Sequence, residues 1–569
     1  MSANSDLEAC IDWCRTNGSY VDDRIVFKLT EKVGITAVAS EAISTKKPLI
    51  SIPKKLLITN EVAMKHFDIT EPVVSRGNPN VLGQLLTAKL KFGSDEECFH
   101  RPYIRILPLK LDQPYFWSAD QLEILKGTDL HLMLRQNLAK MASEWIDVLE
   151  FLKLKPNDMQ FYNKLKSSQD IDILSLFLSM NEISIGTSWL SFPAYVWATS
   201  IFNSRAFPEI IMNSQTSNIN QAFLYPIVDL LNHKNDTKVK WVFENDEVSF
   251  ISLESLKKSE EIFNSYGDKS NEELLLNYGF VQENNANDFT RLSLKLEKQM
   301  LDNASSFGID IKDHIVADDC VQFKLTNEQP LPDSLLEMFN FLCKLKSESQ
   351  LTLRGALEGQ DELHEILIQK VDFFKKRSKI NRPLAASTDL IATIKQYLNS
   401  DRRIYNNSLE ALQKLQKQTM RKNAISMTSF KTIFKNDKEF ANSLLIAFGI
   451  ANFEDFAKQG CMREALLLWI VRVANKDSYP RKLSYAPPRY IYDCFQEVNR
   501  SIVIQKEDVM EFMSFYKKLF PNLSKKIPET FDVGNWGIRQ FIVADNVMDR
   551  LVWTRKQTQE PYFILQNKI

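Results

Sequence analysis

Two β-prone stretches separated by a long helical one constrain the fold of this chain more than any other feature. The first lies within residues 35–52 and the second within residues 223–280, and both contain short β-branched or apolar runs bounded by turn signals. Residues 81–200 lie between them and show apolar residues at helical spacing. The pattern predicts an α+β fold, with a β-rich domain interrupted by a helical insert of about a hundred residues.

Local signals predict several elements within this frame. Residues 239–243 and 248–251 flank Asn245-Asp246, a turn signal typical of a β-hairpin. A short helix is expected over residues 7–15, because Asn17-Gly18 is a helix-end signal. The clearest helices before residue 200 are predicted at 81–92, 146–154 and 173–180.

After Asp288 the pattern becomes helical, and we expect an all-helical domain over residues 290–569, beyond a seam at 284–288. Its clearest helices are predicted at 331–347, 361–377, 404–420, 463–474 and 507–520. The complete predicted division is a first β-rich segment over 20–90, the insert over 91–200, a second β-rich segment over 201–283 and the helical domain over 290–569.

Composition excludes several classes of protein. The chain has 569 residues, 44% hydrophobic and 25% charged, which is typical of a soluble globular protein with roughly two to four structural units. We find no apolar run of membrane-spanning length and no secretory signal pattern. With only 16 glycines, the chain lacks the dinucleotide fingerprint and the phosphate loop, and it has neither a GxSxG nucleophile elbow nor an HExxH metal motif.

The seven cysteines are scattered without CxxC spacing, so we expect reduced thiols inside a cell and no metal cluster. Residues 1–300 carry 32 Lys and Arg against 39 Asp and Glu, whereas the remaining residues carry 39 against 33. The basic run at 370–382 could bind an acidic partner, but a solvated helix end is the simpler explanation. Its final part, 375–382, contains no aromatic residue, which disfavours single-stranded nucleic acid as a ligand.

Three segments place chemically useful groups in order along the chain: 203–207 (NSRAF), 226–233 (PIVDLLNH) and 264–280 (NSYGDKSNEELLLNYGF). Asn232 and His233 offer an amide and an imidazole after an apolar run. Tyr266, followed by Gly267, offers a phenol that a ligand can approach closely. Each feature alone is equally typical of a turn or of a buried core residue, but their succession within about eighty residues indicates a functional site.

With these segments the sequence resembles the SET-domain protein lysine methyltransferases of the Rubisco large-subunit methyltransferase type. The family pattern reads SRAF, then PxxDLLNH, then YGxKSNxELLxxYGF, and all three stand here almost unchanged. The resemblance also covers residues 34–53 and the RPYIRILP stretch at 101–108. It is greatest to fungal enzymes that methylate ribosomal proteins or a translation elongation factor. One departure is Thr36, where the family usually has the second glycine of a Gly-x-Gly cofactor loop.

The resemblance implies a SET-type catalytic domain followed by a helical domain that helps to hold a protein substrate. It implies a protein-lysine N-methyltransferase that transfers a methyl group from S-adenosylmethionine to a lysine of elongation factor 1A or of a large-subunit ribosomal protein. We expect a cytoplasmic monomer that needs no metal and binds neither membrane nor nucleic acid directly. Two alternatives stay open: a catalytically weak SET protein that acts as a binding module, motivated by Thr36, and a helical scaffold with a nucleic-acid-binding face.

The resemblance also assigns roles to individual residues. Tyr266 matches the catalytic tyrosine, whose hydroxyl orients the lysine amine and lies near the cofactor. Arg205 matches a residue near the cofactor carboxylate, a natural charge-assisted pair, and Asp229 is expected to be buried and structural. The cofactor-binding residues are predicted to be Gly34, Arg205, Asn232, His233 and Tyr266, and the walls of the lysine channel are predicted to be Tyr278 and Phe280.

Overall fold

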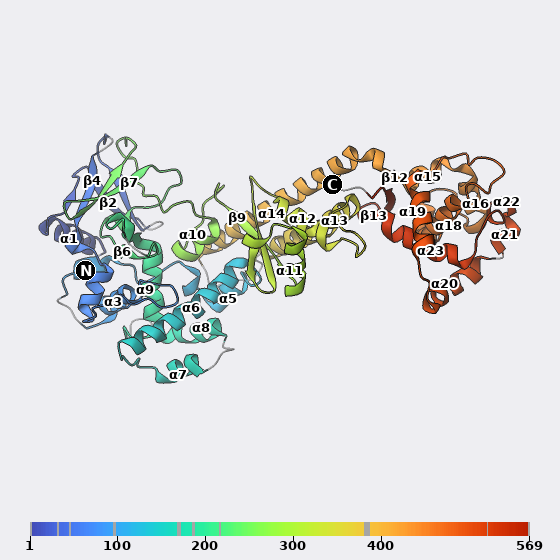
Figure 1. The fold of residues 1–569 in the computed structure, drawn as a ribbon. Helices are drawn as coiled ribbons and strands as arrows, with labels where there is room; N and C mark the ends of the chain where they lie inside the picture. The colour runs from blue at the N-terminus through green and yellow to red at the C-terminus, as the bar shows by residue number, and fades with distance from the viewer. Residues whose placement is uncertain are drawn as a thin grey trace. The chain divides into compact units, whose positions relative to one another are not determined.

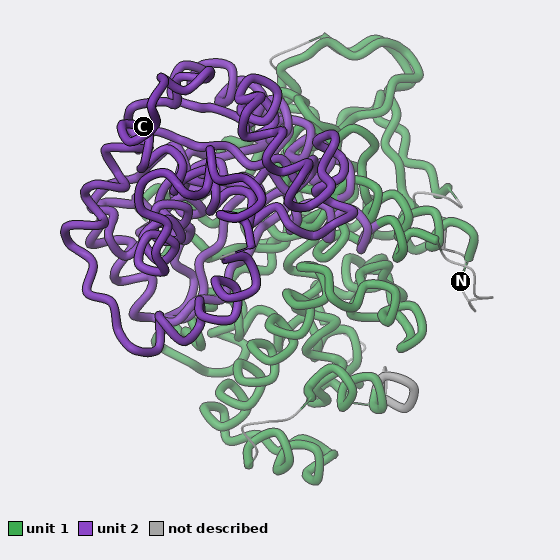
Figure 2. Tube along the Cα trace, turned by 90° about the vertical axis from the view of Figure 1, so that its right-hand side faces the viewer, with its two compact units in different colours: residues 1–289, 375–401 green, residues 290–374, 402–569 purple. Residues whose placement is uncertain are grey.

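The computed structural model describes residues 3–30, 34–44, 47–94, 98–167, 172–184, 188–215, 218–379, 387–520 and 522–566. The chain divides into two compact units, shown in Figure 2: unit 1 contains residues 1–289 and 375–401, and unit 2 contains residues 290–374 and 402–569. The division after Phe289 lies beside the seam expected at 284–288. Residues 375–401, however, belong to unit 1, although the segments before and after them in the sequence, 290–374 and 402–569, belong to unit 2.

A four-stranded antiparallel sheet in unit 1 joins the two β-prone stretches. Its order is β1-β4-β8-β7, and Ser51 of β4 pairs with Ser249 of β8, with their hydroxyl oxygens 2.7 Å apart. Two-stranded sheets form from β2 with β3 and from β5 with β6. The strands are β1 (Tyr20–Val21), β2 (Ile25–Thr30), β3 (Gly34–Ala39), β4 (Pro48–Pro53), β5 (Ala206–Pro208), β6 (Ala222–Leu224), β7 (Val239–Glu244) and β8 (Glu247–Ser252). In Figure 1 the blue β4 and the green β7 accordingly lie in one β-rich region.

The predicted hairpin is confirmed as β7 and β8. Asn245 and Asp246 both adopt positive φ, 53° and 61°. A two-residue turn with both central residues left-handed matches the twist of the strands, and asparagine and aspartate tolerate that conformation better than most residues. The local sequence therefore determines the register of this edge of the sheet.

The helices of unit 1 precede, interrupt and follow the strands. They are α1 (Ala3–Thr16), α2 (Asn60–His66), α3 (Val81–Phe92), α4 (Arg101–Ile106), α5 (Ala119–Glu123), α6 (Asp129–Phe151), α7 (Met159–Ser167), α8 (Ile173–Ser184), α9 (Phe192–Arg205) and α10 (Asn271–Tyr278). The helices expected near 7–15, 81–92 and 173–180 are confirmed. The helix expected at 146–154 is the last part of the longer α6, which ends before Lys153 at φ 55°.

Unit 2 is mainly helical. Its helices are α11 (Lys298–Phe307), α12 (Asp333–Leu342), α13 (Leu353–Arg377), α14 (Thr388–Lys422), α15 (Phe430–Asn436), α16 (Lys438–Phe448), α17 (Asp455–Gln459), α18 (Met462–Ala474), α19 (Arg489–Ser501), α20 (Lys506–Leu519), α21 (Asn522–Lys526), α22 (Pro528–Phe531) and α23 (Ile538–Leu551). The ends of α13 and α14 that fall within 375–401 belong to unit 1. The apolar run at 465–471 forms the buried centre of α18 and packs in the core of this unit.

The expectation that residues 290–569 are all-helical is wrong. Two three-stranded sheets lie there, in the orders β10-β11-β9 and β12-β14-β13. Val321, Phe323 and Leu325 are buried on β11 and alternate with less buried neighbours, which is the pattern of a strand with one face in the core. The strands are β9 (Phe289–Lys295), β10 (Ile315–Ala317), β11 (Cys320–Thr326), β12 (Met427–Ser429), β13 (Val552–Arg555) and β14 (Glu560–Ile564).

Polar contacts, some buried and one exposed, attach residues 375–401 to the rest of unit 1. The Asn271 side-chain amide donates to Asp288 Oδ2 at 2.8 Å and to the Ser400 hydroxyl at 3.3 Å, and Ser400 also donates to Asp288. Arg377 Nη1 donates to the carbonyl of Glu123 in the insert at 2.8 Å. Part of the basic run at 370–382 therefore attaches the chain to the insert, while Arg382 lies outside the described residues.

Within the described part of the chain, no helix combines the length and apolar character needed to cross a bilayer. The same residues contain no cluster of three or more His, Cys, Asp or Glu side chains arranged to hold a metal ion. The structure describes all seven cysteines, and none of them forms a disulfide.

Candidate active site

The segments 226–233 and 264–280 lie side by side in unit 1. His233 and Asn264 form a parallel β-bridge, and the Asn264 N–H donates to the Asn232 carbonyl at 2.8 Å. The next turn of chain carries Tyr266, and α10 follows with Tyr278 as its last residue. Residues more than thirty positions apart are thus held in register by backbone hydrogen bonds.

Three rings stack at this place. The imidazole of His233 lies 4.9 Å from the ring of Tyr266 at 17°, and the ring of Tyr278 lies 4.7 Å from Tyr266 at 15°. Phe280 meets Tyr278 edge to face at 6.2 Å. Tyr266 is therefore held between two flat neighbours and has little freedom to turn.

The hydroxyl of Tyr266 is fixed as well. It donates to the carbonyl of Leu231 at 2.9 Å. Burial raises the pKa of Tyr266 well above its ordinary value, and the nearby Arg205 guanidinium opposes that shift only in part. Tyr266 is therefore a neutral phenol at physiological pH, and its oxygen keeps lone pairs that can accept a hydrogen bond.

His233 is held in one tautomer. Its Nδ1 accepts from the backbone N–H of Tyr266 at 3.0 Å, so the ring proton belongs on Nε2, which donates to Asn235 Oδ1 at 2.9 Å. Burial lowers the pKa of His233 and keeps the ring neutral. This imidazole thus orients the backbone at Tyr266 and stacks on its ring.

The Asn232 amide lies against β3. Its Nδ2 donates to Glu261 Oε1 at 2.8 Å and, more weakly, to the carbonyl of Ile35 at 3.4 Å. Gly34, at the start of β3, has φ +71°, and a Cβ built on it would meet no atom within 4 Å. The backbone at Gly34 therefore faces open space that a ligand can occupy.

Thr36 does not disturb this strand. It pairs with Lys28 in the extended ladder of β2 and β3, and its hydroxyl donates to the Lys28 carbonyl at 3.4 Å. An extended position suits a β-branched residue, and the positive φ falls on Gly34 instead. Threonine in place of glycine at 36 therefore imposes no backbone strain.

Arg205 was expected to pair with the cofactor carboxylate, but in the structure it already pairs with a carboxylate of the protein, that of Asp229. Its Nη1 donates to the Asp229 carbonyl at 3.0 Å and lies 3.4 Å from Asp229 Oδ2. The arginine side chain keeps 23% of its surface exposed, whereas the Asp229 side chain is fully buried. The structure thus brings Arg205, Asn232, His233, Tyr266, Tyr278 and Phe280 into one region of unit 1, and Gly34 adjoins it through the contact of Ile35 with Asn232.

The end of α10 is fixed by a close approach. Gly279 has φ +82°, and a Cβ there would lie 2.7 Å from the backbone of Asp112. Gln113 Nε2 donates to the Asn277 carbonyl at 2.8 Å. Only glycine fits between α10 and the 112–113 segment, so the insert sets where Tyr278 and Phe280 lie.

Sequence reasoning missed two residues of this region. Glu261 accepts from Asn232 and pairs with Val38 across a β-bridge, and Tyr103 donates from α4 to Asp229 Oδ2 at 2.9 Å. The first lies three positions before Asn264, close enough to the motif to be suspected. The second lies in the RPYIRILP stretch, but nothing local indicates its partner 126 positions away.

These residues fit S-adenosylmethionine. An arginine can pair with an amino-acid carboxylate, and the Asn232 amide and Glu261 carboxylate supply polar contacts beside it. A Cβ built on Gly267, at φ +86° next to Tyr266, would also meet nothing within 4 Å. Open backbone at Gly34 and Gly267 therefore borders the polar groups and the ring stack.

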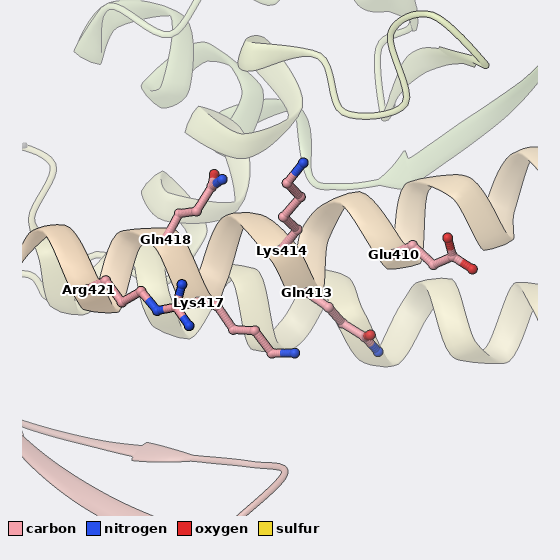
Figure 3. A pocket seen from close by; sticks show the side chains of 6 residues that line it. All are labelled: Glu410, Gln413, Lys414, Lys417, Gln418 and Arg421. Atoms are coloured by element: carbon pink, nitrogen blue, oxygen red, sulfur yellow. The ribbon is translucent and has the colours of Figure 1, made fainter.

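Unit 2 contains a separate basic groove on α14. Six exposed side chains on successive turns line a cavity of about 280 Å³: Glu410, Gln413, Lys414, Lys417, Gln418 and Arg421 (Figure 3). The cations Lys414, Lys417 and Arg421 make no ion pair with any residue that the structure describes. We call these six residues the α14 groove.

Comparison with known proteins gives a consistent result. Residues 34–267 match the family model of the SET domain, and residues 289–423 match that of the EFM1 middle domain. The chain is 42% identical to the protein-lysine N-methyltransferase EFM1 of Saccharomyces cerevisiae, over 100% of this chain and 99% of that protein. It is 29% identical to the ribosomal lysine N-methyltransferase 1 of the same yeast, over 85% of this chain and 89% of that one.

Other similar proteins are less alike in sequence. The actin-histidine N-methyltransferase of Xenopus tropicalis is 24% identical over 63% of this chain and 56% of its own length. Among solved structures, the SET domain of LSMT bound to lysine and AdoHcy superposes with a TM-score of 0.52 at 16% identity, over 74% of this chain and 94% of that chain. Rubisco LSMT bound to AdoMet gives a TM-score of 0.51 at 17% identity, over 73% and 93%. At such identities the likeness shows a shared fold.

Proposed function

This chain belongs to the SET-domain family and, within it, to the group of the yeast protein-lysine N-methyltransferase EFM1, and we propose that it methylates a lysine of a translation protein with S-adenosylmethionine. The acceptor is an elongation factor or a ribosomal protein: the motifs resemble those of fungal enzymes that methylate either, and one yeast relative is named a ribosomal lysine N-methyltransferase. The observation that carries the proposal is the phenol of Tyr266, immobilised between His233 and Tyr278 with its proton held by Leu231.

S-adenosylmethionine supplies an electrophilic methyl group on a sulfonium sulfur. Arg205 holds its carboxylate, and Asn232, His233 and the open backbone at Gly34 form the rest of the cradle. The Tyr266 oxygen accepts a hydrogen bond from the amine and so directs the nitrogen lone pair along the line of transfer. Tyr278 and Phe280 surround the lysine with apolar surface, which excludes water and favours the neutral amine that a nucleophile requires.

Thr36 gives little support to the alternative of a catalytically weak binding module. Its hydroxyl hydrogen bond lies within the β2–β3 pair, and the left-handed position remains a glycine. Cofactor binding should therefore be intact, and Thr36→Gly should leave the affinity for S-adenosylmethionine within about threefold, since no strain is relieved. Isothermal titration of both proteins measures this ratio.

The α14 groove is our candidate for recognition of the protein substrate. Lys414 and Arg421 are seven residues apart, about 10 Å along the helix. Acidic side chains at alternate positions of an extended segment are about 7 Å apart. This spacing is shorter than the distance from Lys414 to Arg421, so Lys414, Lys417 and Arg421 together can bind two such side chains. The groove lacks aromatic side chains on which bases could stack, which favours an acidic protein segment over single-stranded nucleic acid.

Charge reversal tests the groove. The triple variant Lys414→Glu, Lys417→Glu and Arg421→Glu should raise KM for the intact protein substrate at least tenfold and leave turnover of a short lysine peptide unchanged. The matched control reverses Lys517, Lys518 and Lys525, which are exposed basic residues of α20 and α21. Equal effects of the two triple variants would show that the groove is only a solvated face.

The function itself is tested with labelled S-adenosylmethionine and an extract of cells that lack the enzyme. The labelled protein should be an elongation factor or a ribosomal protein, and its hydrolysate should contain N-methyllysine. Methylhistidine in the hydrolysate would instead favour the acceptor named for the 24% identical actin enzyme.

A further inference from the structure

Three elements of unit 1 meet at one buried carboxylate. Tyr103 of α4 donates its hydroxyl to Asp229 Oδ2 at 2.9 Å, and Arg205 at the end of α9 lies 3.4 Å from the same oxygen. The Asp229 side chain is fully buried, and its Oδ1 has no hydrogen-bond partner among the described residues. Tyr103 and Arg205 are thus its two polar side-chain partners, and only Arg205 also reaches solvent.

Asp229 also stabilises a strained turn. Ile227 has φ 69° and ψ −46°, a rare conformation for a β-branched residue, and the Val228 N–H donates to the Pro226 carbonyl at 2.9 Å across it. Such strain persists only where the surroundings hold it. Two residues later Asp229 is bound to α4 and α9, and two residues after that the Leu231 carbonyl accepts the Tyr266 hydroxyl.

We propose that Tyr103 is a positioning residue: its hydrogen bond keeps the Asp229 carboxylate ionised and in place, and Asp229 in turn aims Arg205 at the carboxylate of the cofactor. The proposal rests on the proposed function, since it needs a cofactor carboxylate at Arg205. It gives the helical insert an indirect part in cofactor binding, because Tyr103 acts through Asp229 on Arg205.

The electrostatics of the cluster support this role. Burial raises the pKa of Asp229 to about 6, while Arg205 and the Tyr103 hydrogen bond lower it. The other titratable groups that face the cluster are Cys10 of α1 and Tyr266. Burial raises the pKa of the Tyr103 and Tyr266 hydroxyls. Hydrogen bonding with Cys14, together with burial, raises the pKa of the Cys10 thiol. These three groups stay neutral, so Asp229 is the group of the cluster that titrates near neutrality.

Loss of the Tyr103 hydroxyl therefore has a pH signature. Without that hydrogen bond the carboxylate is less well stabilised, so its pKa rises and it becomes protonated closer to pH 7. Protonation removes the charge that holds Arg205, and cofactor affinity falls. A purely structural tyrosine would instead change affinity by the same factor at every pH.

The experiment measures the dissociation constant of S-adenosylhomocysteine by isothermal titration from pH 5.5 to 8.5, on the full chain. We expect wild-type affinity to weaken as pH falls through about 6. In Tyr103→Phe the midpoint should move up by about one pH unit, a typical effect of losing a hydrogen bond to a charged group, so affinity should fall about twofold near pH 7 and about eightfold at pH 5.5. His233 titrates alike in both proteins, so the difference between the curves isolates Asp229.

Two further variants complete the test. Asp229→Asn should bind weakly and without this pH step, because it cannot ionise. Tyr115→Phe is the matched control, since Tyr115 is a buried tyrosine of the same insert whose hydroxyl accepts from Asn137 at 2.9 Å. A Tyr103→Phe curve that coincides with that of wild type, or that is displaced equally at all pH values as in Tyr115→Phe, overturns the proposal. Failure of the wild-type chain to bind S-adenosylhomocysteine would contradict the proposed function instead.

Discussion

Removal of one oxygen atom from Tyr266 tests the candidate mechanism most sharply. In Tyr266→Phe the ring keeps its stacking on His233 and Tyr278, while the hydrogen bond to the Leu231 carbonyl at 2.9 Å is lost. The lost bond should lower the free energy of unfolding by about 0.5–1.5 kcal/mol. If the oxygen orients the amine, kcat should fall roughly a hundredfold, which corresponds to about 2.7 kcal/mol of transition-state stabilisation.

The matched control is Tyr225→Phe. Tyr225 is a buried tyrosine of the same unit, and its hydroxyl donates to the carbonyl of Val248 at 2.6 Å. The control makes the same chemical change and should lose similar stability, but it should keep kcat. Steady-state kinetics, cofactor titration and thermal melting on each preparation separate the effects. A folded Tyr266→Phe enzyme with wild-type turnover would refute the role of the hydroxyl.

Three further outcomes follow from the structure. Burial lowers the pKa of His233, so at mildly acid pH the unfolded chain binds a proton at this residue that the folded chain does not. The free energy of unfolding should therefore fall as pH drops below about 6.5, and the fall in melting temperature between pH 7.5 and 5.5 should be smaller in His233→Gln than in wild type. Gly279→Ala should lower unfolding free energy in urea by more than the roughly 1–2 kcal/mol of a left-handed alanine, because its Cβ would meet Asp112 at 2.7 Å. Asp437→Asn should destabilise unit 2 by about 3 kcal/mol in the same assay, since it leaves the buried Arg472 with less compensation.

Each of these outcomes has a control. An equal pH dependence in wild type and His233→Gln would remove His233 from the acid response. Gly77→Ala has the same left-handed backbone, φ +76°, but open space around the new Cβ, so it should cost only the backbone strain. Asp493→Asn breaks an exposed ion pair with Arg489 and should cost no more than about 1 kcal/mol. Equal losses within either pair would contradict the packing described here.

The sequence predicted those elements that local chemistry determines. Asn245 and Asp246 favour a left-handed turn between two strands, and both adopt positive φ here, while Gly18 follows the end of α1 with φ +98°. The sheets of unit 2 could also have been predicted in part, because Val321, Phe323 and Leu325 show the period-two alternation of a strand.

The site was harder to predict, because its geometry depends on contacts between distant residues. The motif resemblance identified His233, Tyr266 and Tyr278, but the stacking of their rings depends on a β-bridge between His233 and Asn264. The partner of Arg205 follows from the packing of α4, α9 and the strained turn at Ile227. Buried polar pairs of this kind leave no periodic trace in a sequence.

A crystal structure of the chain with S-adenosylhomocysteine and a lysine peptide of its substrate would test the proposed mechanism by locating both ligands. The carboxylate of the ligand should contact Arg205, and the lysine amine should lie within hydrogen-bond distance of the Tyr266 oxygen, between Tyr278 and Phe280. A ligand bound away from the His233–Tyr266–Tyr278 stack, or a lysine amine that does not reach Tyr266, would contradict this mechanism.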